Sequence, residues 1–210
     1  SYVFEAQTAA AGKEVWISDG TAVGTTMISD VNAGPATSAP NNLTVLGNEV
    51  LFVAAFANST LWKTDGTMAS TVQVAPAISF CHSLAVFGNE VLMAAWDGVN
   101  GSEPWKTDGT TTGTQLIDDL ADISGTGGSA PREFVDGDGT LFVTANDGVT
   151  GVELWTSDGT AAGTALVTDL VPGLIGSVPQ QLIRVGDEVF FTTTRTNPPG
   201  IDPELWKSDG

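Results

Sequence analysis

The stretch Trp155-Thr-Ser-Asp-Gly159 decides the fold, because its pattern Trp-x-(Ser/Thr)-Asp-Gly recurs five times in 210 residues. The copies are Trp16–Gly20, Trp62–Gly66, Trp105–Gly109, Trp155–Gly159 and Trp206–Gly210. Successive tryptophans lie 46, 43, 50 and 51 positions apart. This spacing is typical of propeller blades and exceeds that of leucine-rich or ankyrin repeats. We therefore expect one supersecondary unit per copy, and a single domain over residues 1–210.

The segments around each copy are typical of β-strands. Each is short, rich in Val, Leu, Phe and Thr, and bounded by Gly, Asn, Asp or Pro, as in residues 181–185, 188–192 and 204–206. No segment has a sustained period of 3.6 residues. The sequence therefore predicts an all-β protein with four strands in each complete unit.

The links between segments predict how the strands pair. Gly47-Asn48, Gly88-Asn89 and Gly186-Asp187 each separate two apolar runs and are typical of two-residue hairpin turns. The third strand carries the motif Trp and ends in Asp-Gly, where Asp can accept a backbone hydrogen bond and Gly can take a positive φ. Connectors rich in Gly, Ser and Pro then lead to the next unit, as expected when the chain crosses from an outer strand to the next inner strand of a β-propeller.

This assignment predicts five Trp-bearing blades of four-stranded antiparallel sheet. Three are complete, at residues 39–76, 83–120 and 131–170. The first unit lacks its inner strand and the last lacks its outer strand. The chain begins without Met and stops within a motif, so we expect both ends to be cut. Because both terminal units contain the second and third strands and so overlap, we expect closure of the ring to need residues outside this chain, or a partner.

The longest well-formed copy, Glu153-Leu-Trp-Thr-Ser-Asp-Gly-Thr-Ala-Ala-Gly-Thr164, resembles the ELWxxDGT repeat. That family of tandem repeats is common in secreted and surface-attached bacterial proteins, so the resemblance implies a repeat scaffold that is secreted or at the cell surface. Three positions depart from it: Thr60 replaces Glu, Pro104 replaces Leu, and Ser70 stands where other copies have Gly.

Charge and composition exclude several function classes. Acidic residues outnumber basic ones 25 to 7, giving a formal charge of −18, and the seven cations are scattered, which disfavours nucleic acid as a partner. No apolar stretch approaches the roughly 18 residues of a membrane helix. Cys81 and His82 are the only cysteine and histidine, and we interpret both as packing residues.

Aromatic residues suggest both a structural and a binding role. The motif tryptophans recur in register, which favours wedging between neighbouring blades. Trp96 lies outside the motif, in the first of three loops between second and third strands (residues 95–102, 146–152 and 195–202), and is a candidate for stacking on a ligand. Loops of variable length on a rigid scaffold often carry binding. The predicted ligand-binding residues are Trp96, Asp97, Asn100, Asp147 and Asn197.

Recurring carboxylates suggest either calcium sites or backbone caps. Pairing of the third and fourth strands brings Glu153 near Asp169, Glu103 near Asp119, and Glu14 near Asp30. Such pairs must share a proton, bind a cation such as calcium, or accept N–H groups from the adjacent connector. Asp136 and Asp138 resemble the start of a calcium loop but align with the hairpin turns of other blades.

These observations favour a non-catalytic extracellular module for binding or adhesion, with a glycan or a surface protein as its partner. Two alternatives remain open. The chain could be a structural repeat that self-associates in a filament or matrix, or is one part of a longer chain. It could also be a glycosidase or lyase using carboxylates such as Glu133, Asp136 and Asp138. No recognisable nucleophile or transition-metal constellation is present in the sequence.

Overall fold

The computed structural model describes residues 1–54, 58–121, 127–194 and 203–210. Apart from two short 3-10 helices, η1 (Met68–Ser70) and η2 (Ala161–Gly163), its regular elements are strands. The strands are β1 (Tyr2–Thr8), β2 (Gly12–Ser18), β3 (Thr26–Ser29), β4 (Pro40–Leu46), β5 (Glu49–Ala54), β6 (Thr60–Thr64), β7 (Val72–Gln73), β8 (Ser79–Phe87), β9 (Glu90–Trp96), β10 (Ser102–Thr107), β11 (Gln115–Leu116), β12 (Arg132–Asp136), β13 (Leu141–Asn146), β14 (Val152–Ser157), β15 (Ala165–Thr168), β16 (Pro179–Val185), β17 (Glu188–Thr193) and β18 (Glu204–Ser208).

The described strands form five antiparallel sheets, one for each copy of the motif. Three sheets have four strands, in the orders β4-β5-β6-β7, β8-β9-β10-β11 and β12-β13-β14-β15. The sheets at the two ends, β1-β2-β3 and β16-β17-β18, have three. The predicted all-β class, the four-stranded units and the two shorter terminal units are confirmed.

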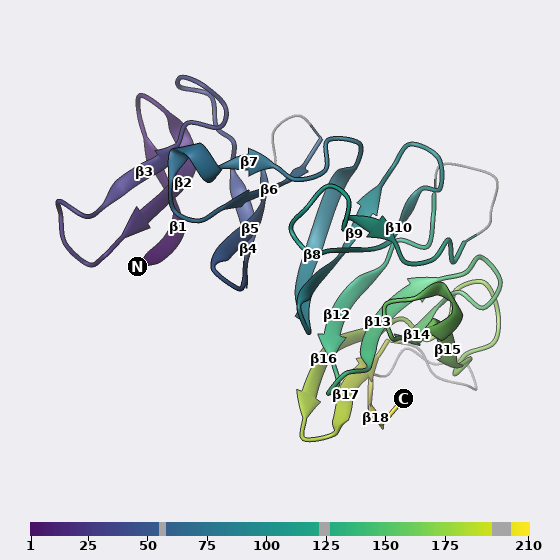
Figure 1. Cartoon of the computed structure of the whole chain (residues 1–210). Helices are drawn as coiled ribbons and strands as arrows, with labels where there is room; N and C mark the ends of the chain where they lie inside the picture. Colours follow the sequence, from purple (N-terminus) through teal and green to yellow (C-terminus); the bar gives the residue numbers. More distant parts are fainter. Residues whose placement is uncertain (55–57, 122–126, 195–202) are drawn as a thin grey trace.

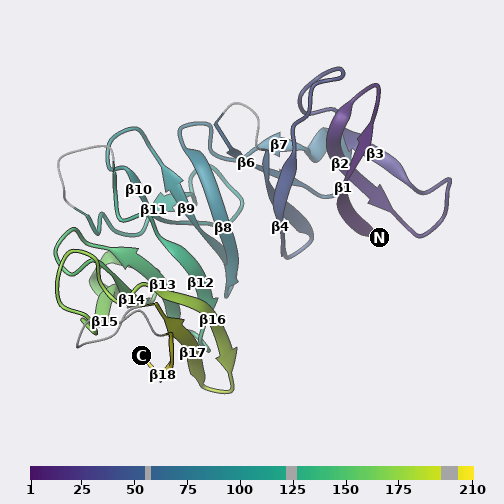
Figure 2. The same ribbon diagram turned by 180° about the vertical axis from the view of Figure 1, so that it is seen from behind.

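The sheets follow one another in a curved row (Figure 1), and the view from behind shows the same order (Figure 2). Along this row β4 contacts β8, β8 contacts β12, and β12 contacts β16. These inner strands therefore lie at the centre of a propeller-like arrangement. The described part of the chain forms no closed ring, because its first and last sheets lie at opposite ends of the row. The number of blades in a complete ring stays a prediction.

The Asp-Gly turns have the predicted geometry. Gly159 has a φ of 85°, and Asp158 Oδ1 accepts a hydrogen bond from Thr160 N at 2.9 Å. The Thr160 hydroxyl also donates to Asp158 Oδ1, and its oxygen accepts from Gly163 N. This second cap starts η2, a short helix that the strand pattern did not predict.

The hydrophobic core lies between neighbouring sheets. Each cluster joins side chains from the middle strands of two sheets, for example Leu92 of β9 with Leu141 of β13. Trp155 packs against that cluster, Trp105 against the preceding one and Trp62 against the one before. The predicted wedging of motif tryptophans between blades is confirmed for these three rings.

Trp155→Ala tests how far this wedge stabilises the fold. Removing the ring should cost about 3–5 kcal/mol, because a cavity remains between two sheets that cannot fully collapse. Trp206→Ala is the matched control, since Trp206 occupies the same motif position but is 37% exposed and should cost clearly less. Denaturant unfolding would measure both, and equal losses would contradict the role assigned to Trp155.

Candidate functional site

In three sheets, the strand that carries the motif Trp has a fully buried glutamate near its start. Glu14, Glu103 and Glu153 are each 0% exposed. Each accepts hydrogen bonds from both the backbone N–H and the hydroxyl of one serine in the connector to the next sheet. The serines are Ser38, Ser129 and Ser177, with N to carboxylate oxygen distances of 2.8, 2.7 and 2.8 Å. We call each pair a Glu–Ser clamp.

A third donor completes each clamp. The backbone N–H groups of Val31, Leu120 and Val171, which follow the fourth strand, donate to the same three glutamates at 3.0, 3.2 and 3.4 Å. One carboxylate thus fixes both ends of the connector. A buried carboxylate requires such donors, because an ion without partners costs far more than a neutral polar group.

Burial and hydrogen bonding shift the pKa of these clamp glutamates in opposite directions. The pKa of Glu153 is raised, chiefly by burial and further by the charge of Asp169, while the hydrogen bonds from Ser177 lower it. The pKa of Glu103 is raised by burial in the same way, with Asp119 adding to the rise. The predicted proximity of glutamate and aspartate in these two pairs is therefore confirmed.

In the structure these glutamates cap backbone N–H groups, which is one of the two roles, capping or calcium binding, that the sequence left open. Within the described ranges, no group of three His, Cys, Asp or Glu side chains is arranged to hold a metal ion. Asp30 Oδ2 accepts from Gly34 N, whereas Asp30 Oδ1 and Asp169 Oδ1 are buried without a hydrogen-bond partner. Asp119 interacts with its surroundings as well. Calcium at these pairs stays a prediction.

The second junction differs, because Thr60 replaces the clamp glutamate. The Thr60 hydroxyl accepts from the indole Nε1 of Trp62 at 3.0 Å instead of anchoring a connector. At the three clamped junctions, the residue after the clamp serine donates its N–H to the carbonyl that precedes the glutamate, as Ala130 does to Ser102. Here Cys81 donates to that carbonyl, on Ser59, and Phe80 donates to Asn58. Compared with the clamped junctions, the backbone hydrogen bonds at this junction are therefore shifted by one residue.

This shifted connector presents an aromatic pair. Phe80 has a φ of 52° and is 49% exposed. Its ring meets Trp96 edge-on, with centroids 5.7 Å apart and planes at 64°. Trp96 is partly exposed at the end of β9. The sequence indicated Trp96 but not Phe80, because the register shift that brings Phe80 to the ring depends on contacts with a neighbouring sheet.

The other predicted ligand residues mainly stabilise their own loops. Asp97 accepts from the backbone N–H groups of Val99 and Asn100 and from the Asn100 amide. Asp147 accepts from Val149 N, Thr150 N and the Thr150 hydroxyl. These residues lie at the same end of the sheets as Trp96, but Asp97 Oδ1, Asp97 Oδ2 and Asp147 Oδ1 accept hydrogen bonds from their own loops. Asn197 lies outside the described residues.

A cavity of about 510 Å³ opens on this face, between β12 and the connector that leads to β16. Its lining includes Arg132, Glu133, Asn146, Gln180 and Gln181, together with residues 128–130. The volume is in the range of roughly 300–1,000 Å³ that small-ligand sites occupy. No sequence pattern singled out Arg132, because only the fold shows that it lies on an inner strand beside a cavity.

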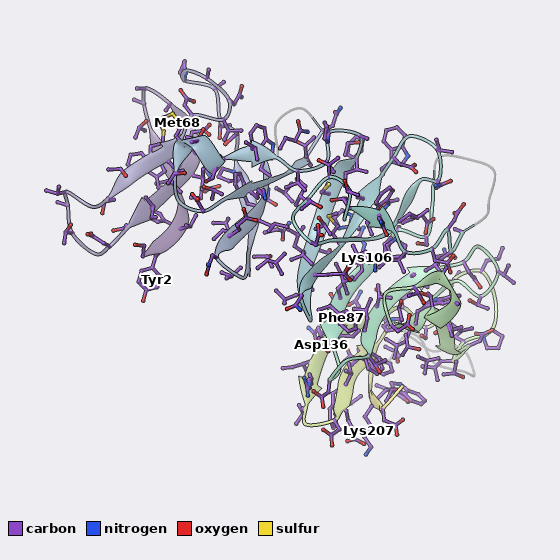
Figure 3. All side chains as sticks on the ribbon, in the orientation of Figure 1. Tyr2, Met68, Phe87, Lys106, Asp136 and Lys207 are labelled. Atoms are coloured by element: carbon purple, nitrogen blue, oxygen red, sulfur yellow. The ribbon has the colours of Figure 1, made fainter. Side chains whose placement is uncertain are left out.

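The opposite face, made by the Asp-Gly turns, has a larger and shallower hollow of about 790 Å³, near the labelled Phe87 and Asp136 (Figure 3). Its acidic groups are engaged: Glu90 pairs with Lys106 at 3.4 Å, and Asp138 with Arg184 at 3.0 Å. Asp136 accepts from Gly139 N, which makes this segment the hairpin turn that the alignment favoured.

Cys81 and His82 occupy the inner strand β8. Cys81 is buried, and burial raises the pKa of its thiol to about 12, so it is not a reactive thiolate. The pKa of His82 is lowered by burial and by the charge of Arg132. Glu133, a candidate for acid catalysis, accepts from the backbone N–H of Leu182 at 3.3 Å.

Comparisons with known proteins support the fold alone. No family model and no curated protein matches the sequence. A puromycin hydrolase mutant, solved in complex with PGG, matches with a TM-score of 0.60 at 14% identity, over 94% of this chain and 31% of that one. A structure from a study of two prolyl endopeptidases matches with a TM-score of 0.55 at 10% identity, over 99% of this chain and 35% of that one.

The computationally designed Ika8 protein gives a TM-score of 0.50 at 17% identity, over 98% of this chain and 55% of the design. The chain thus spans about a third of the length of the two hydrolases. These likenesses support a propeller-like, all-β arrangement. No helix of the described chain is long and apolar enough to cross a membrane.

The Glu–Ser clamp can be tested by substitution. Glu153→Ala should cost about 2–4 kcal/mol, because it leaves the Ser177 N–H, the Ser177 hydroxyl and the Val171 N–H without their acceptor. Ser177→Ala removes one donor and should cost about 1 kcal/mol. The double variant should lose less than the sum of the two, which shows direct coupling.

Glu204→Ala is the control for this set, since Glu204 holds the same motif position but is exposed. Chemical unfolding of all four variants would measure the losses. A loss for Glu153→Ala as small as that for Glu204→Ala would show that the clamp does not stabilise the fold.

Proposed function

We propose that this chain is a non-catalytic extracellular binding module, an arc of a β-propeller built from ELWxxDGT-type repeats, and that its partner is a carbohydrate. The sheets would be five blades of a ring completed by further blades or by a partner. The resemblance of the five motif copies to repeats of secreted and surface-attached bacterial proteins supports the location at or outside the cell surface.

The observation that carries the proposal is the aromatic pair at the junction without a clamp. Phe80 and Trp96 stand partly exposed on a rigid sheet end, on the face that also carries the loops after β9 and β13. The apolar face of a sugar ring packs on such aromatic surfaces, and a tryptophan ring adds an N–H donor at its edge. A side chain held by an edge contact loses little freedom when it binds, which favours affinity.

A comparison of the second junction with the three clamped ones also explains why the proposed site would form only at the second. The three clamped junctions dock their connectors closely, so that a Cβ on Gly151 would lie 2.2 Å from Gly176 N. Their residues in the position of Phe80 are Ala39, Ala130 and Val178. Loss of the glutamate at the second junction therefore coincides with a change from small side chains to a large aromatic one, as expected if this junction is specialised for recognition.

A glycan array probed with the protein tests the proposal. We expect binding to at least one glycan class, and at least a tenfold loss in Trp96→Ala and in Phe80→Ala, since stacking on the pair is removed. Tyr2→Ala is the control, because Tyr2 is 79% exposed on β1 at the far end of the row (Figure 3). Melting curves would check that each variant is folded.

Unchanged binding in both aromatic variants would contradict the placement of the site. Absence of binding to any glycan, together with concentration-dependent assembly in light scattering, would favour the structural-filament alternative instead.

A further inference from the structure

The inner strands share a distortion near their start. Each has a residue with positive φ at the same position of the strand, where the pairing with its neighbour slips. These residues are Asn42, Ser83, Glu133 and Gln181, with φ of 51, 56, 55 and 57°. The residues just before them are Asn41, His82, Arg132 and Gln180. A bulge of this kind redirects side chains and is often found beside functional sites.

Arg132 is the exception among the cations of the described chain. Five others form ion pairs at 2.6 to 3.4 Å: Lys13, Lys63, Lys106, Arg184 and Lys207. Arg132 forms none, although acidic residues outnumber basic ones by more than three to one. Its neighbour Glu133 does not pair with it and instead accepts the Leu182 N–H on β16. An exposed guanidinium is thus left facing a cavity.

The groups around this guanidinium suit a polar ligand with one negative charge. Asn146, Gln180 and Gln181 provide amides, which can donate to and accept from hydroxyl groups. The guanidinium fork matches the two oxygens of a carboxylate in a bidentate pair. The formal charge of −18 repels densely charged polyanions at long range, so the site would favour a single acidic group among neutral ones.

The cavity and the aromatic pair belong to one surface. Phe80 is the second residue of β8 and Arg132 begins β12, and these two inner strands contact each other. His82 on β8 and Arg132 on β12 each precede the bulge of their strand, and the charge of Arg132 lowers the pKa of His82 after the larger effect of burial. A ligand stacked on Trp96 and Phe80 could therefore extend across His82 toward the cavity.

We propose that Arg132 binds the carboxylate of an acidic sugar, so that the ligand is a glycan carrying a uronic acid residue. This rests on the proposed function and adds the chemical class of its ligand. The neutral part of the glycan would stack on Trp96 and Phe80, and the uronate would enter the cavity, with its hydroxyl groups at Asn146 and the two glutamines.

The test compares oligosaccharides that differ only in one terminal residue, glucuronate or glucose, by titration calorimetry. We expect the acidic form to bind the protein at least tenfold more tightly. Arg132→Gln should abolish that difference, because the carboxylate contact is lost. Arg184→Gln is the control, since Arg184 already pairs with Asp138. It should keep the preference.

Several results would overturn the proposal. Equal affinity for the two forms would do so, as would a preference that persists in Arg132→Gln. A preference for a sulfated counterpart over the glucuronate would exclude the carboxylate, and binding of acidic peptides without any glycan would exclude the sugar. Neutral binding that depends on Trp96 but shows no acid preference would contradict this inference while leaving the proposed function intact.

Discussion

The structure depends on a carboxylate that is buried where three of the sheets meet the connector to the next sheet. Glu153 receives donors from both ends of one connector, the N–H of Val171 and the N–H and hydroxyl of Ser177. The ion is stable there only because these donors replace water. The same requirement fixes the geometry: the connector must bring its serine back to the start of the third strand, and this sets where the next inner strand begins.

The close contacts around the clamp follow from that requirement. Gly151 and Gly176 approach so closely that a side chain on either would meet backbone of the other segment, and Gly101 and Gly128 do the same one sheet earlier. The motif tryptophans then fill the space between adjacent sheets from the other side. Clamp and wedge together make a rigid row of sheets. A junction that lacks the glutamate is free to dock its connector differently, and there the aromatic pair is found.

Much of this could be predicted from the sequence, because it depends on local patterns repeated in register. The Asp-Gly turn around Asp158, the hairpins at Gly-Asn and the position of Trp155 each follow from residues adjacent in the chain. The proximity of Glu153 to Asp169 follows from simple strand pairing. Each clamp serine lies two residues before a proline at or just before the start of an inner strand. This repeat is the signal in the sequence that could have indicated the clamp.

The remaining features need contacts between sheets, which no local pattern contains. The slips at Ser83 and Glu133 occur at residues that have no special preference for positive φ. The one-residue shift at Phe80 depends on the absence of a clamp carboxylate at Thr60. The exposure of Arg132 to a cavity depends on the curvature of the whole row. The loops after β9 and β13 lie at the same end of their sheets as Trp96, but Asp97 and Asp147 stabilise their own turns.

Native-state hydrogen exchange tests the central role of the clamp most directly. If the buried glutamates hold the sheets together, the backbone N–H groups of Ser38, Ser129 and Ser177 should exchange as slowly as those of the middle strands, although they lie in connectors. Exchange of these three groups as fast as that of exposed loop positions such as Val23 would show that the connectors open independently, and would contradict the account.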